Sequence, residues 1–488
     1  LINGMYPIDN INDVKMAYRD LLTDEDMFIF SAVAPTAYRH IENHGRSKAA
    51  QAARDIAIAN IAPDIVYVIS FFEGHGDSYT ASIPADNMPW KTVCVCHDLI
   101  PLLNKERYLG DPNFREFYMN KLAEFERADA IFAISQSAAQ EVIEYTDIAS
   151  DRVLNISSAV GEEFAVIDYS AERIQSLKDK YRLPDEFILT LAMIEPRKNI
   201  EALIHAYSML PAELQQRYPM VLAYKVHPED LERILRLAES YGLSRSQLIF
   251  TGFLTDDDLI ALYNLCKLFV FPSLHEGFGL PPLEAMRCGA ATLGSNITSL
   301  PEVIGWEDAM FNPHDVQDIR RVMEKALTDE AFYRELKAHA LTQSAKFSWA
   351  NTAHLAIDGF TRLLQSSKEV DAGQTEGVTT SRIQTMQKID ALSEVDRLGL
   401  AWAVARNGYK QHTRKLLVDI SVLAKHDAKT GIQRVSRSIL SELLKSGVPG
   451  YEVSAVYYTP GECYRYANQY LSSNFPGEYG ADEPVLFS

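Results

Sequence analysis

The sequence has too little positive charge for a nucleic-acid partner. Its 488 residues include 47 Lys and Arg against 66 Asp and Glu, a formal net charge of −19 at pH 7. A protein that binds a phosphate backbone needs a basic face, which this composition does not favour. We therefore expect no nucleic acid among the partners.

Long apolar runs and cysteines are also scarce. No run reaches the ~18 apolar residues of a membrane-spanning helix, and the chain does not start with the basic and apolar segments of a signal peptide. The five cysteines form no regular framework, which favours a reducing compartment. Cys94 and Cys96 alternate along a predicted strand as small core residues do, with a redox pair as the alternative. We expect a cytoplasmic, soluble protein, and contact with the inner face of a membrane stays open.

The length predicts several domains. The 47% of hydrophobic residues is ample for cores, and at ~150 residues per domain the chain should form about three. It opens at Leu1 rather than Met and ends at Ser488 inside an apolar run. We interpret it as a fragment of a longer protein.

The most informative stretch is FVFPSLHEGFGLPPLE, from Phe269 to Glu284. It begins as an apolar run typical of a buried parallel strand, which Pro272 ends. Gly277 and Gly279 then let backbone N–H groups approach a ligand without a Cβ in the way. Two prolines suit the first turn of the helix that follows. Strand, glycine loop and helix N-terminus together predict an anion-binding site.

Two carboxylates flank this predicted site eight positions apart, Glu276 in the loop and Glu284 in the helix. The loop amides can hold a diphosphate, while each carboxylate accepts hydrogen bonds from neutral hydroxyl groups on its own side. A nucleotide sugar has this layout of ribose, diphosphate and hexose. An ordinary surface loop before an amphipathic helix is the alternative.

The stretch resembles the Glu-x7-Glu signature of the retaining glycosyltransferases of family 4. These have the α/β fold called GT-B, with two Rossmann-like parallel-sheet domains facing a cleft. By that resemblance Glu276 binds the donor sugar and Glu284 the ribose. No metal and no cofactor are expected besides the nucleotide sugar as co-substrate. The acidic run Thr255–Asp258 is interpreted as a helix cap with first-turn carboxylates, and a DxD metal site is the alternative. The expected donor-binding residues are Gly277, Phe278, Gly279, Leu280, Glu284 and Phe253.

Residues 1–172 alternate apolar strands with amphipathic helices, which predicts a first Rossmann-like domain. The family resemblance implies that this domain lies on the acceptor side. Polar residues follow its strands at the edge where open α/β sheets bind ligands. His97 comes directly after the buried run Val93–Cys96, and the surrounding CHDLIPL resembles the HDLIPL segment of the family. The resemblance implies that His97 lies beside the donor sugar and the β-phosphate. A structural histidine is the alternative.

Three further residues at this edge are candidates for the acceptor side: Glu73, Gly74 and Asp98. A simple turn is an equal alternative for Glu73 and Gly74, and a cap on the next helix is an equal alternative for Asp98. The run from Ser135 to Ser137 precedes a helical pattern and is interpreted as a helix cap.

Residues 173–352 predict a second Rossmann-like domain. By the family resemblance, this domain binds the nucleotide sugar. Arg197 and Lys198 follow its first strand and are expected to begin the next helix, where basic residues oppose the helix dipole. Two adjacent cations supply positive charge, which stabilises the negative charge of a leaving diphosphate. Their stretch EPRKN matches the family motif, although the glycine usual before it is replaced at Ala192 or Met193.

The remaining residues extend this organisation. Residues 353–366 resemble the family's last helix, which crosses back onto the first domain, with an ordinary terminal helix as the alternative. Residues 367–413 have the composition of a linker with helices. Residues 414–488 resemble the start of a second glycosyltransferase domain, including the acceptor loop near Gly431 that the first domain lacks. We therefore expect two such domains in tandem in the intact protein.

The resemblance implies one activity first, the transfer of a hexose from a nucleotide sugar, with retention at the anomeric carbon, to a growing surface polysaccharide or lipid-linked glycan. Mannose from GDP-mannose is our first choice of donor by family analogy. The expected catalytic residues are His97, Arg197, Lys198 and Glu276.

Two other functions stay open: a nucleotide-sugar epimerase, and a non-catalytic glycan-binding or scaffold domain of a polysaccharide synthase. The complete set of candidate residues argues against a scaffold, which needs none of them. Peripheral contact with a membrane or a synthase complex is a further open point.

Overall fold

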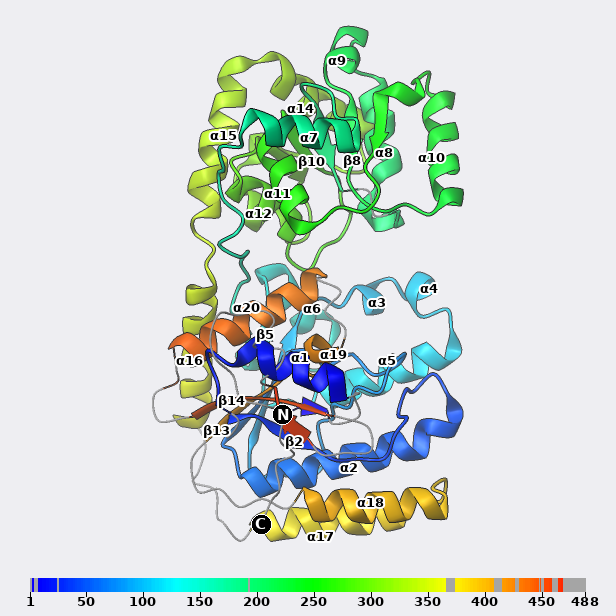
Figure 1. Ribbon diagram of the computed structural model, residues 1–488, viewed down its shortest axis with the longest axis vertical. Helices are drawn as coiled ribbons and strands as arrows, with labels where there is room; N and C mark the ends of the chain where they lie inside the picture. The colour runs from blue at the N-terminus through cyan, green and yellow to red at the C-terminus, as the bar shows by residue number, and fades with distance from the viewer. Residues whose placement is uncertain are drawn as a thin grey trace. The chain divides into compact units, whose positions relative to one another are not determined.

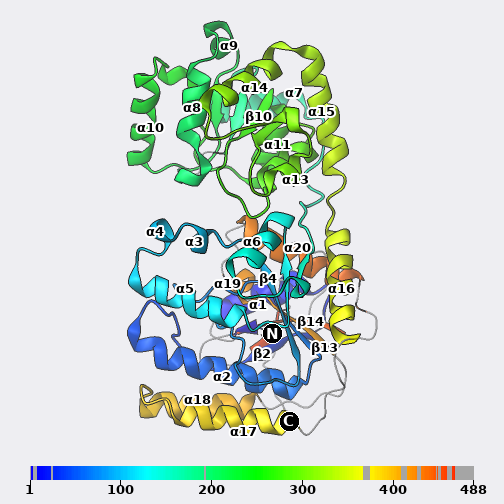
Figure 2. The same cartoon turned by 180° about the vertical axis from the view of Figure 1, so that it is seen from behind.

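The computed structural model describes residues 2–3, 8–23, 26–191, 194–365, 374–407, 415–425, 430–446, 448, 452–458 and 464–467. The chain divides into two compact units, whose elements are labelled in Figure 1 and seen from behind in Figure 2. Each unit is a mainly parallel sheet with helices packed around it, so the predicted α/β class with two Rossmann-like sheets is confirmed. Unit 1 holds Leu1–Ile134, Ala139–Ile156 and Trp349–Ser488, and unit 2 holds Ser135–Ala138 and Ser157–Ser348.

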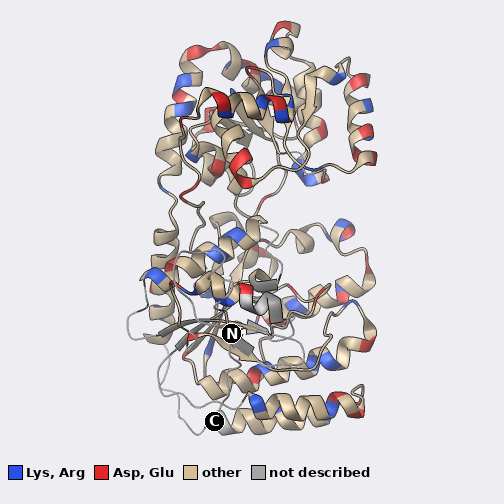
Figure 3. Cartoon of the chain, viewed as in Figure 1, with Lys and Arg blue, Asp and Glu red and all other residues tan. Residues whose placement is uncertain are grey.

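Unit 2 is built on six parallel strands in the order β12-β11-β10-β7-β8-β9. Its strand β10 is the apolar run predicted from the sequence, and all four of its side chains are buried. None of the six strands contains a charged residue, and the charges lie on the helices and loops around them (Figure 3). The strands are β7 (Ile188–Thr190), β8 (Met220–Leu222), β9 (Leu248–Phe250), β10 (Leu268–Phe271), β11 (Thr292–Ser295) and β12 (Met310–Phe311).

The helices of unit 2 are amphipathic and bury one apolar face. In α10 (Pro228–Ser240) the buried side chains are Ile234, Leu235 and Ala238. The others are α7 (Ala171–Tyr181), α8 (Ile200–Ser208), α9 (Ala212–Arg217), α11 (Asp256–Leu265), α12 (Leu280–Arg287), α13 (Leu300–Ile304), α14 (Val316–Thr328) and α15 (Glu330–Ser344), with short 3₁₀ turns η4 (Pro196–Lys198), η5 (Arg245–Gln247) and η6 (Glu307–Ala309).

Unit 1 has a nine-stranded sheet in the order β1-β2-β15-β14-β13-β3-β4-β5-β6. Strand β15 is antiparallel to both of its neighbours, and the other pairings are parallel. The strands are β1 (Ile2–Asn3), β2 (Phe28–Phe30), β3 (Ile65–Val68), β4 (Lys91–Cys96), β5 (Ala130–Ala133), β6 (Val153–Asn155), β13 (Lys415–Asp419), β14 (Glu452–Tyr458) and β15 (Tyr464–Tyr466).

The helices of unit 1 come from both ends of the chain (Figure 1). Across the described parts of both units, no helix combines the length and the apolar character needed to cross a bilayer. The helices are α1 (Ile8–Tyr18), α2 (His44–Ile61), α3 (Ile100–Leu103), α4 (Lys105–Tyr108), α5 (Pro112–Phe125), α6 (Gln136–Tyr145), α16 (Trp349–Gln365), α17 (Gln374–Gln387), α18 (Glu394–Arg406), α19 (Ser421–Lys425) and α20 (Gly431–Ser446), with η2 (Ile41–Asn43) and η3 (Ser150–Arg152) as 3₁₀ turns.

The C-terminal strands lie in the middle of the unit 1 sheet. Strand β13 pairs with β3 in parallel over four residues and with β14 on its other side. Its alternating residues Leu416 and Val418 are buried, as is Ile420 directly after it. The sequence predicted that residues 414–488 begin a separate domain, whereas the structure places their described part in unit 1, because β13 covers the edge that β3 would otherwise expose. That the same residues open a second glycosyltransferase domain in a longer protein stays a prediction.

The helix α16 also belongs to unit 1. Phe360 lies 5.1 Å from the ring of Tyr67 and 5.1 Å from that of Phe132, measured between ring centroids. A Cβ at Gly359 would lie 2.4 Å from the Phe132 ring, so the absence of a side chain there lets the helix approach β5 closely. This segment overlaps the one in which the sequence predicted a helix crossing back to the first domain.

The two helices of the predicted linker are docked on unit 1. Helices α17 and α18 pack against α2. Arg382 donates hydrogen bonds to Asp55 and Asp86, each at 2.7 Å. Burial raises the pKa of Asp55 to about 6, and the Arg382 charge opposes this rise. The Asn407 side chain hydrogen-bonds both the N–H and the C=O of Ser31. The linker composition thus did not show that these helices extend the core of unit 1.

We expect Val418→Asp to destabilise unit 1 by about 3 kcal/mol or more, because it buries an unpaired charge in the middle of the sheet. The readout is amide hydrogen exchange at β3, whose residues pair with β13. The matched control is Ile432→Asp in the same segment, at a position 41% exposed. Unchanged protection of β3 in the Val418 variant would contradict the position of β13 beside it.

Candidate functional site

The strand order of unit 2 reverses between β7 and β10. From β7 the chain continues outward through β8 and β9, and from β10 it continues in the opposite direction through β11 and β12. Open α/β sheets bind ligands at such a reversal, outside the carboxyl ends of the strands. The loop after β7 carries Arg197 and Lys198, and the loop after β10 carries Glu276. The sheet topology therefore brings the predicted catalytic residues of this unit together.

The carboxylate of Glu276 lies at the centre of a buried cluster. Its Oε1 atom lies 2.6 Å from Lys198 Nζ and accepts a hydrogen bond from Ser273 Oγ at 2.6 Å. Its Oε2 atom lies 3.1 Å from Arg197 Nη1. Glu276 and Lys198 are each only 8% exposed. A carboxylate can remain charged at this depth because two cations and a hydroxyl group replace its water.

Burial and charge act in opposite directions on the cluster. Burial on its own would raise the pKa of Glu276, but the charges of Lys198 and Arg197 and the hydrogen bonds from Lys198 and Ser273 outweigh it, so the pKa lies below its usual value. Burial lowers the pKa of Lys198, against the attraction of Glu276. The paired arrangement keeps Glu276 ionised, as an acceptor for hydroxyl groups.

Direct contacts connect the two loops. Leu274 N donates a hydrogen bond to Arg197 O at 2.6 Å, and Arg197 Nη1 donates one to His275 O at 3.1 Å. The prediction that Arg197 and Lys198 begin the following helix is wrong: they occupy the 3₁₀ turn η4, and α8 starts at Ile200 after Asn199 in the left-handed conformation. Pairing with Glu276, rather than an opposed helix dipole, explains the two cations.

The glycine loop leads into α12 as the sequence predicts. Gly279 precedes the helix at φ 110°, and a Cβ there would lie 2.7 Å from the Leu300 side chain. Leu280 is the first helical residue and the two prolines occupy the first turn. Gly277 O accepts a hydrogen bond from Ser135 Oγ at 2.6 Å within unit 2. The loop thus has a backbone that only glycine adopts without strain at its junction with the helix.

The other donor-side candidates have unequal exposure. Glu284 is 3% exposed, and its Oε2 accepts a hydrogen bond from Tyr263 Oη at 3.0 Å. Phe278 is buried and its ring lies 5.6 Å from that of Phe347. Phe253, after β9, is 75% exposed. The contact of Glu284 with ribose and that of Phe253 with the donor stay predictions.

His97 follows β4 in unit 1, at the carboxyl edge of that sheet. Its Nε2 lies 2.9 Å from Ile69 O and must carry the proton, because a carbonyl oxygen only accepts. Its Nδ1 is shielded from solvent and has no hydrogen-bond partner among the described residues. Burial lowers the pKa of His97 to about 4. The ring is therefore neutral at pH 7 and presents Nδ1 as an acceptor.

The acceptor-side candidates of unit 1 have mostly local roles. Asp98 accepts a hydrogen bond at 3.0 Å from Ile100 N, at the first residue of α3, whose N-cap residue is Leu99. Gly74 has φ 104°, and a Cβ there would lie 2.6 Å from Tyr79 O. Glu73 is half-buried, and burial raises its pKa to about 7. The structure supports the turn at Gly74 and gives Asp98 a local bond to the start of α3, and contact of these residues with an acceptor stays a prediction.

Three interpretations from the sequence are confirmed: two helix caps and one pair of cysteines in the core. Ser135 Oγ accepts from Ala138 N in the first turn of α6. Thr255 caps α11, and the buried carboxylate of Asp258 pairs with Arg173 and Lys180. The thiols of Cys94 and Cys96 are free and buried, and burial raises their pKa. Among the described residues, no three His, Cys, Asp or Glu side chains gather as metal ligands would.

The sequence did not identify the residues that hold the Glu276 backbone. Glu276 N donates to Thr298 Oγ1 at 3.2 Å, and Ser299 Oγ donates to Glu276 O at 2.9 Å. Thr298 has φ 54°, which is strained for a β-branched residue. The only available signal was that Thr298 and Ser299 follow β11, at the same edge of the sheet.

Comparisons with known proteins give a consistent family. Residues 173–345 match the family described as "Glycosyl transferases group 1". Over all of its 488 residues the chain is 97% identical to a serotype-specific mannosyltransferase, WbdA, from Escherichia coli, and it spans 60% of that protein's length. It is 34% identical over 274 residues to the O-antigen chain mannosyltransferase B of Escherichia coli, covering 55% of this chain and 70% of that protein.

A similar solved structure is the sucrose-phosphate synthase of Thermosynechococcus elongatus. The TM-score is 0.47 and the sequence identity 20%, with 57% of this chain and 69% of that chain covered.

We expect Lys198→Met to destabilise unit 2 by about 3 kcal/mol, because it leaves Glu276 buried with one cation fewer. The matched control is Lys178→Met, whose partner Asp185 is 95% exposed, with an expected loss below about 1 kcal/mol. Urea unfolding measures both. Because the pKa of Glu276 is lowered in the folded protein, the pair stabilises above the usual Glu pKa and the difference between the variants should shrink as the pH falls through the folded pKa. If Lys198→Met and Lys178→Met lowered the free energy of unfolding equally at pH 7, the Glu276 cluster would not be buried.

Gly74→Ala should lower the stability of unit 1 by about 2 kcal/mol, because its backbone conformation suits only glycine and the added Cβ would meet Tyr79 O. Gly76→Ala is the matched control, since a Cβ there has no neighbour within 4 Å. Thermal unfolding of the two variants checks the difference. A Gly74 variant as stable as the Gly76 variant would refute the strained turn.

Proposed function

This chain belongs to the group 1 glycosyltransferases, and on that premise we propose that it transfers mannose from a nucleotide sugar to a growing O-antigen-like glycan. Both relatives named above are mannosyltransferases, which supports the choice of sugar. The chain spans 60% of the length of the first of them, so the activity of the whole protein is part of the proposal. Retention at the anomeric carbon and GDP as the nucleotide are further parts of it, taken from the family resemblance.

The buried cluster of Glu276, Lys198 and Arg197 is the observation that carries the proposal. It lies at the strand-order reversal of unit 2, beside a glycine loop and the N-terminus of α12. A diphosphate bound there would receive hydrogen bonds from the two cations and from the helix end. The two cations would then contact the diphosphate instead of Glu276. Glu276 would accept hydrogen bonds from the sugar hydroxyl groups. The charges and hydrogen bonds of the cluster thus suit a donor with a diphosphate and a sugar.

The proposed reaction is a substitution at the anomeric carbon. The acceptor hydroxyl oxygen forms a bond to that carbon on the face that the diphosphate leaves, and the bond between the carbon and the diphosphate oxygen breaks. The acceptor proton passes to a phosphate oxygen. Arg197, Lys198 and the start of α12 stabilise the negative charge that develops on the leaving diphosphate. In this proposal the two cations supply that charge stabilisation without a metal ion.

His97 fits this reaction as a neutral hydrogen-bond acceptor. Its Nδ1 lone pair is free among the described residues, and its Nε2–H is fixed to Ile69 O. Such a group can accept from a donor-sugar hydroxyl group and orient the sugar. Because burial lowers its pKa to about 4, His97 should not act as a general acid near pH 7.

The substrates suggest where the reaction takes place. Nucleotide sugars are made in the cytoplasm, so we place the transfer on that side of the membrane. A lipid-linked acceptor would hold the protein at the inner face of the membrane.

The test is to titrate the chain with GDP-, UDP- and dTDP-sugars and to assay transfer to a mannose-terminated, lipid-linked glycan. We expect saturable binding of GDP-mannose and transfer that falls about 100-fold or more in Glu276→Ala, because the sugar loses its main acceptor. The control is Glu239→Ala, an exposed carboxylate in unit 2.

Two results would count against the proposal. Absence of donor binding by the folded chain would leave a non-catalytic domain. Full transfer activity in a folded Glu276→Ala variant would show that the cluster is not required for transfer.

A further inference from the structure

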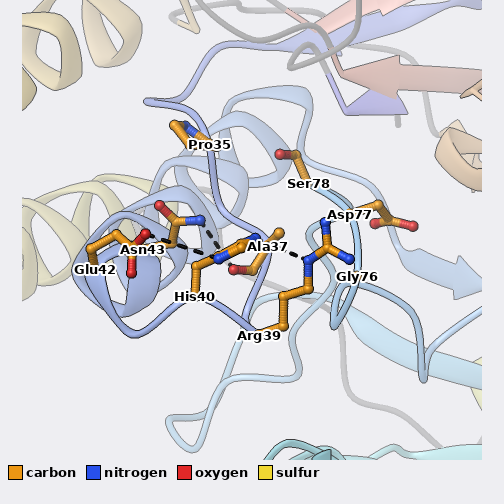
Figure 4. Close-up of a pocket in the computed structure, with 9 residues that line it drawn as sticks. All are labelled: Pro35, Ala37, Arg39, His40, Glu42, Asn43, Gly76, Asp77 and Ser78. Carbon is orange, nitrogen blue, oxygen red and sulfur yellow. Dashed lines mark hydrogen bonds and ion pairs between the residues drawn. The ribbon is translucent and has the colours of Figure 1, made fainter.

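Unit 1 contains a pocket that is lined by none of the predicted site residues. It lies between the loop after β2 and the loop after β3 (Figure 4), with a volume of about 680 Å³. This volume is typical of small-ligand sites. Both loops leave the carboxyl ends of strands in a mainly parallel sheet, the edge at which α/β folds bind ligands. The lining residues are Pro35, Ala37, Arg39, His40, Glu42, Asn43, Gly76, Asp77 and Ser78.

Hydrogen bonds hold the two loops of the pocket together. Arg39 N donates to His75 O at 2.9 Å, and Tyr38 N donates to Gly74 O at 3.0 Å. Thr36 makes two further bonds to Ser78: its N–H donates to Ser78 Oγ at 3.2 Å and its Oγ1 donates to Ser78 O at 3.0 Å. These bonds fix the two loops relative to each other, which reduces the entropy lost when a ligand binds.

A chain of hydrogen bonds connects Asn43, which lines the pocket, to helix α18. Asn43 Nδ2 donates to Ala37 O at 3.1 Å, inside the first loop. Arg46 Nη1 donates to Asn43 Oδ1 at 3.2 Å, and Arg46 Nε pairs with Asp396 of α18 at 2.9 Å. The docked helices of residues 374–407 thus support the pocket.

The polar groups of the pocket suit a ligand with several hydroxyl groups. Arg39 Nε lies 3.0 Å from His40 Nε2, while the Arg39 Nη atoms have no hydrogen-bond partner among the described residues (Figure 4). Glu42 has one loose contact, 4.0 Å from His40 Nδ1. Asp77 Oδ1 accepts from Tyr79 N at 2.7 Å. Sugar hydroxyl groups can donate to these carboxylates and accept from the guanidinium.

The charge balance argues against an anionic ligand. The charged side chains among the lining residues are two carboxylates, Glu42 and Asp77, and one guanidinium, Arg39, with the His40 ring beside them. A phosphate or a uronic acid would meet net negative charge there, whereas a neutral sugar meets donors and acceptors without repulsion. Neither His97 nor Glu73 lines the pocket, so it differs from the predicted reaction site of this unit.

We propose that this pocket is a subsite for a neutral sugar of the acceptor glycan, distant in the glycan from the hydroxyl group that reacts. The inference rests on the proposed transferase function and extends it: the pocket makes longer acceptors bind better than short ones. Transfer itself should not require the pocket, because neither His97 nor Glu73 lines it.

The experiment compares transfer of mannose to a short mannose acceptor and to a longer neutral mannan oligosaccharide. The variants are Asp77→Asn, which keeps the shape and the bond to Tyr79, and Arg39→Gln. We expect each to raise KM for the long acceptor about 10-fold, the effect of one lost charge-assisted hydrogen bond. The value of kcat and the KM for the short acceptor should not change. Glu144→Gln, on the exposed surface of unit 1, is the control.

A second measurement separates this inference from the proposed function. Calorimetry without donor should show that the mannan oligosaccharide binds the chain and binds Asp77→Asn about 10-fold more weakly. Transfer without any length preference, or a preference that both variants keep, would overturn the subsite and leave the transferase standing. Absence of transfer would overturn the transferase, and calorimetry would still decide the subsite. Tighter binding of a phosphorylated oligosaccharide than of the neutral one would also refute the neutral-sugar subsite.

Discussion

The buried ion pair between Glu276 and Lys198 imposes the strictest requirement on this structure. A lone charge at that depth would cost several kcal/mol, so the two side chains must meet with their atoms 2.6 Å apart. They come from loops after different strands, and only the reversal of strand order between β7 and β10 makes those loops neighbours. Ser273 and Arg197 complete the shell of the carboxylate. The sheet, the glycine loop and the charge pairing are therefore parts of a single arrangement.

Unit 1 depends on a different constraint, the completion of its sheet by residues far apart in the sequence. Strand β13 covers β3 on one side and β14 on the other, so the described C-terminal strands lie inside the sheet rather than beside it. Helices α17 and α18 connect the C-terminal segment to α2 a second time, through the ion pair between Arg382 and Asp55. Through Arg46 and Asp396 the same helices reach the pocket between the loops after β2 and β3. A distant part of the chain thus supports a surface that could recognise a glycan.

Much of the fold and of the candidate site could be predicted because the signals are local. The buried run before Pro272, the glycine at position 279 and the two following prolines fix the strand, the turn and the helix start within a few residues of each other. His97 was placed at the sheet edge because it directly follows a buried strand. Thr298 and Ser299 were missed because their contact with Glu276 joins segments that have no local pattern in common.

The sequence by itself determined the element types, the α/β class and the chemistry of the glycine loop, since periodicity, turn residues and charge are properties of neighbouring residues. Only the tertiary structure decided which strands pair and which charges meet. Lys198 and Glu276 are 78 positions apart, and Arg382 lies 327 positions from Asp55. At such separations many partners have the same charge and the same local pattern. The choice among them is made by packing the whole unit, where a buried charge has to find its partner.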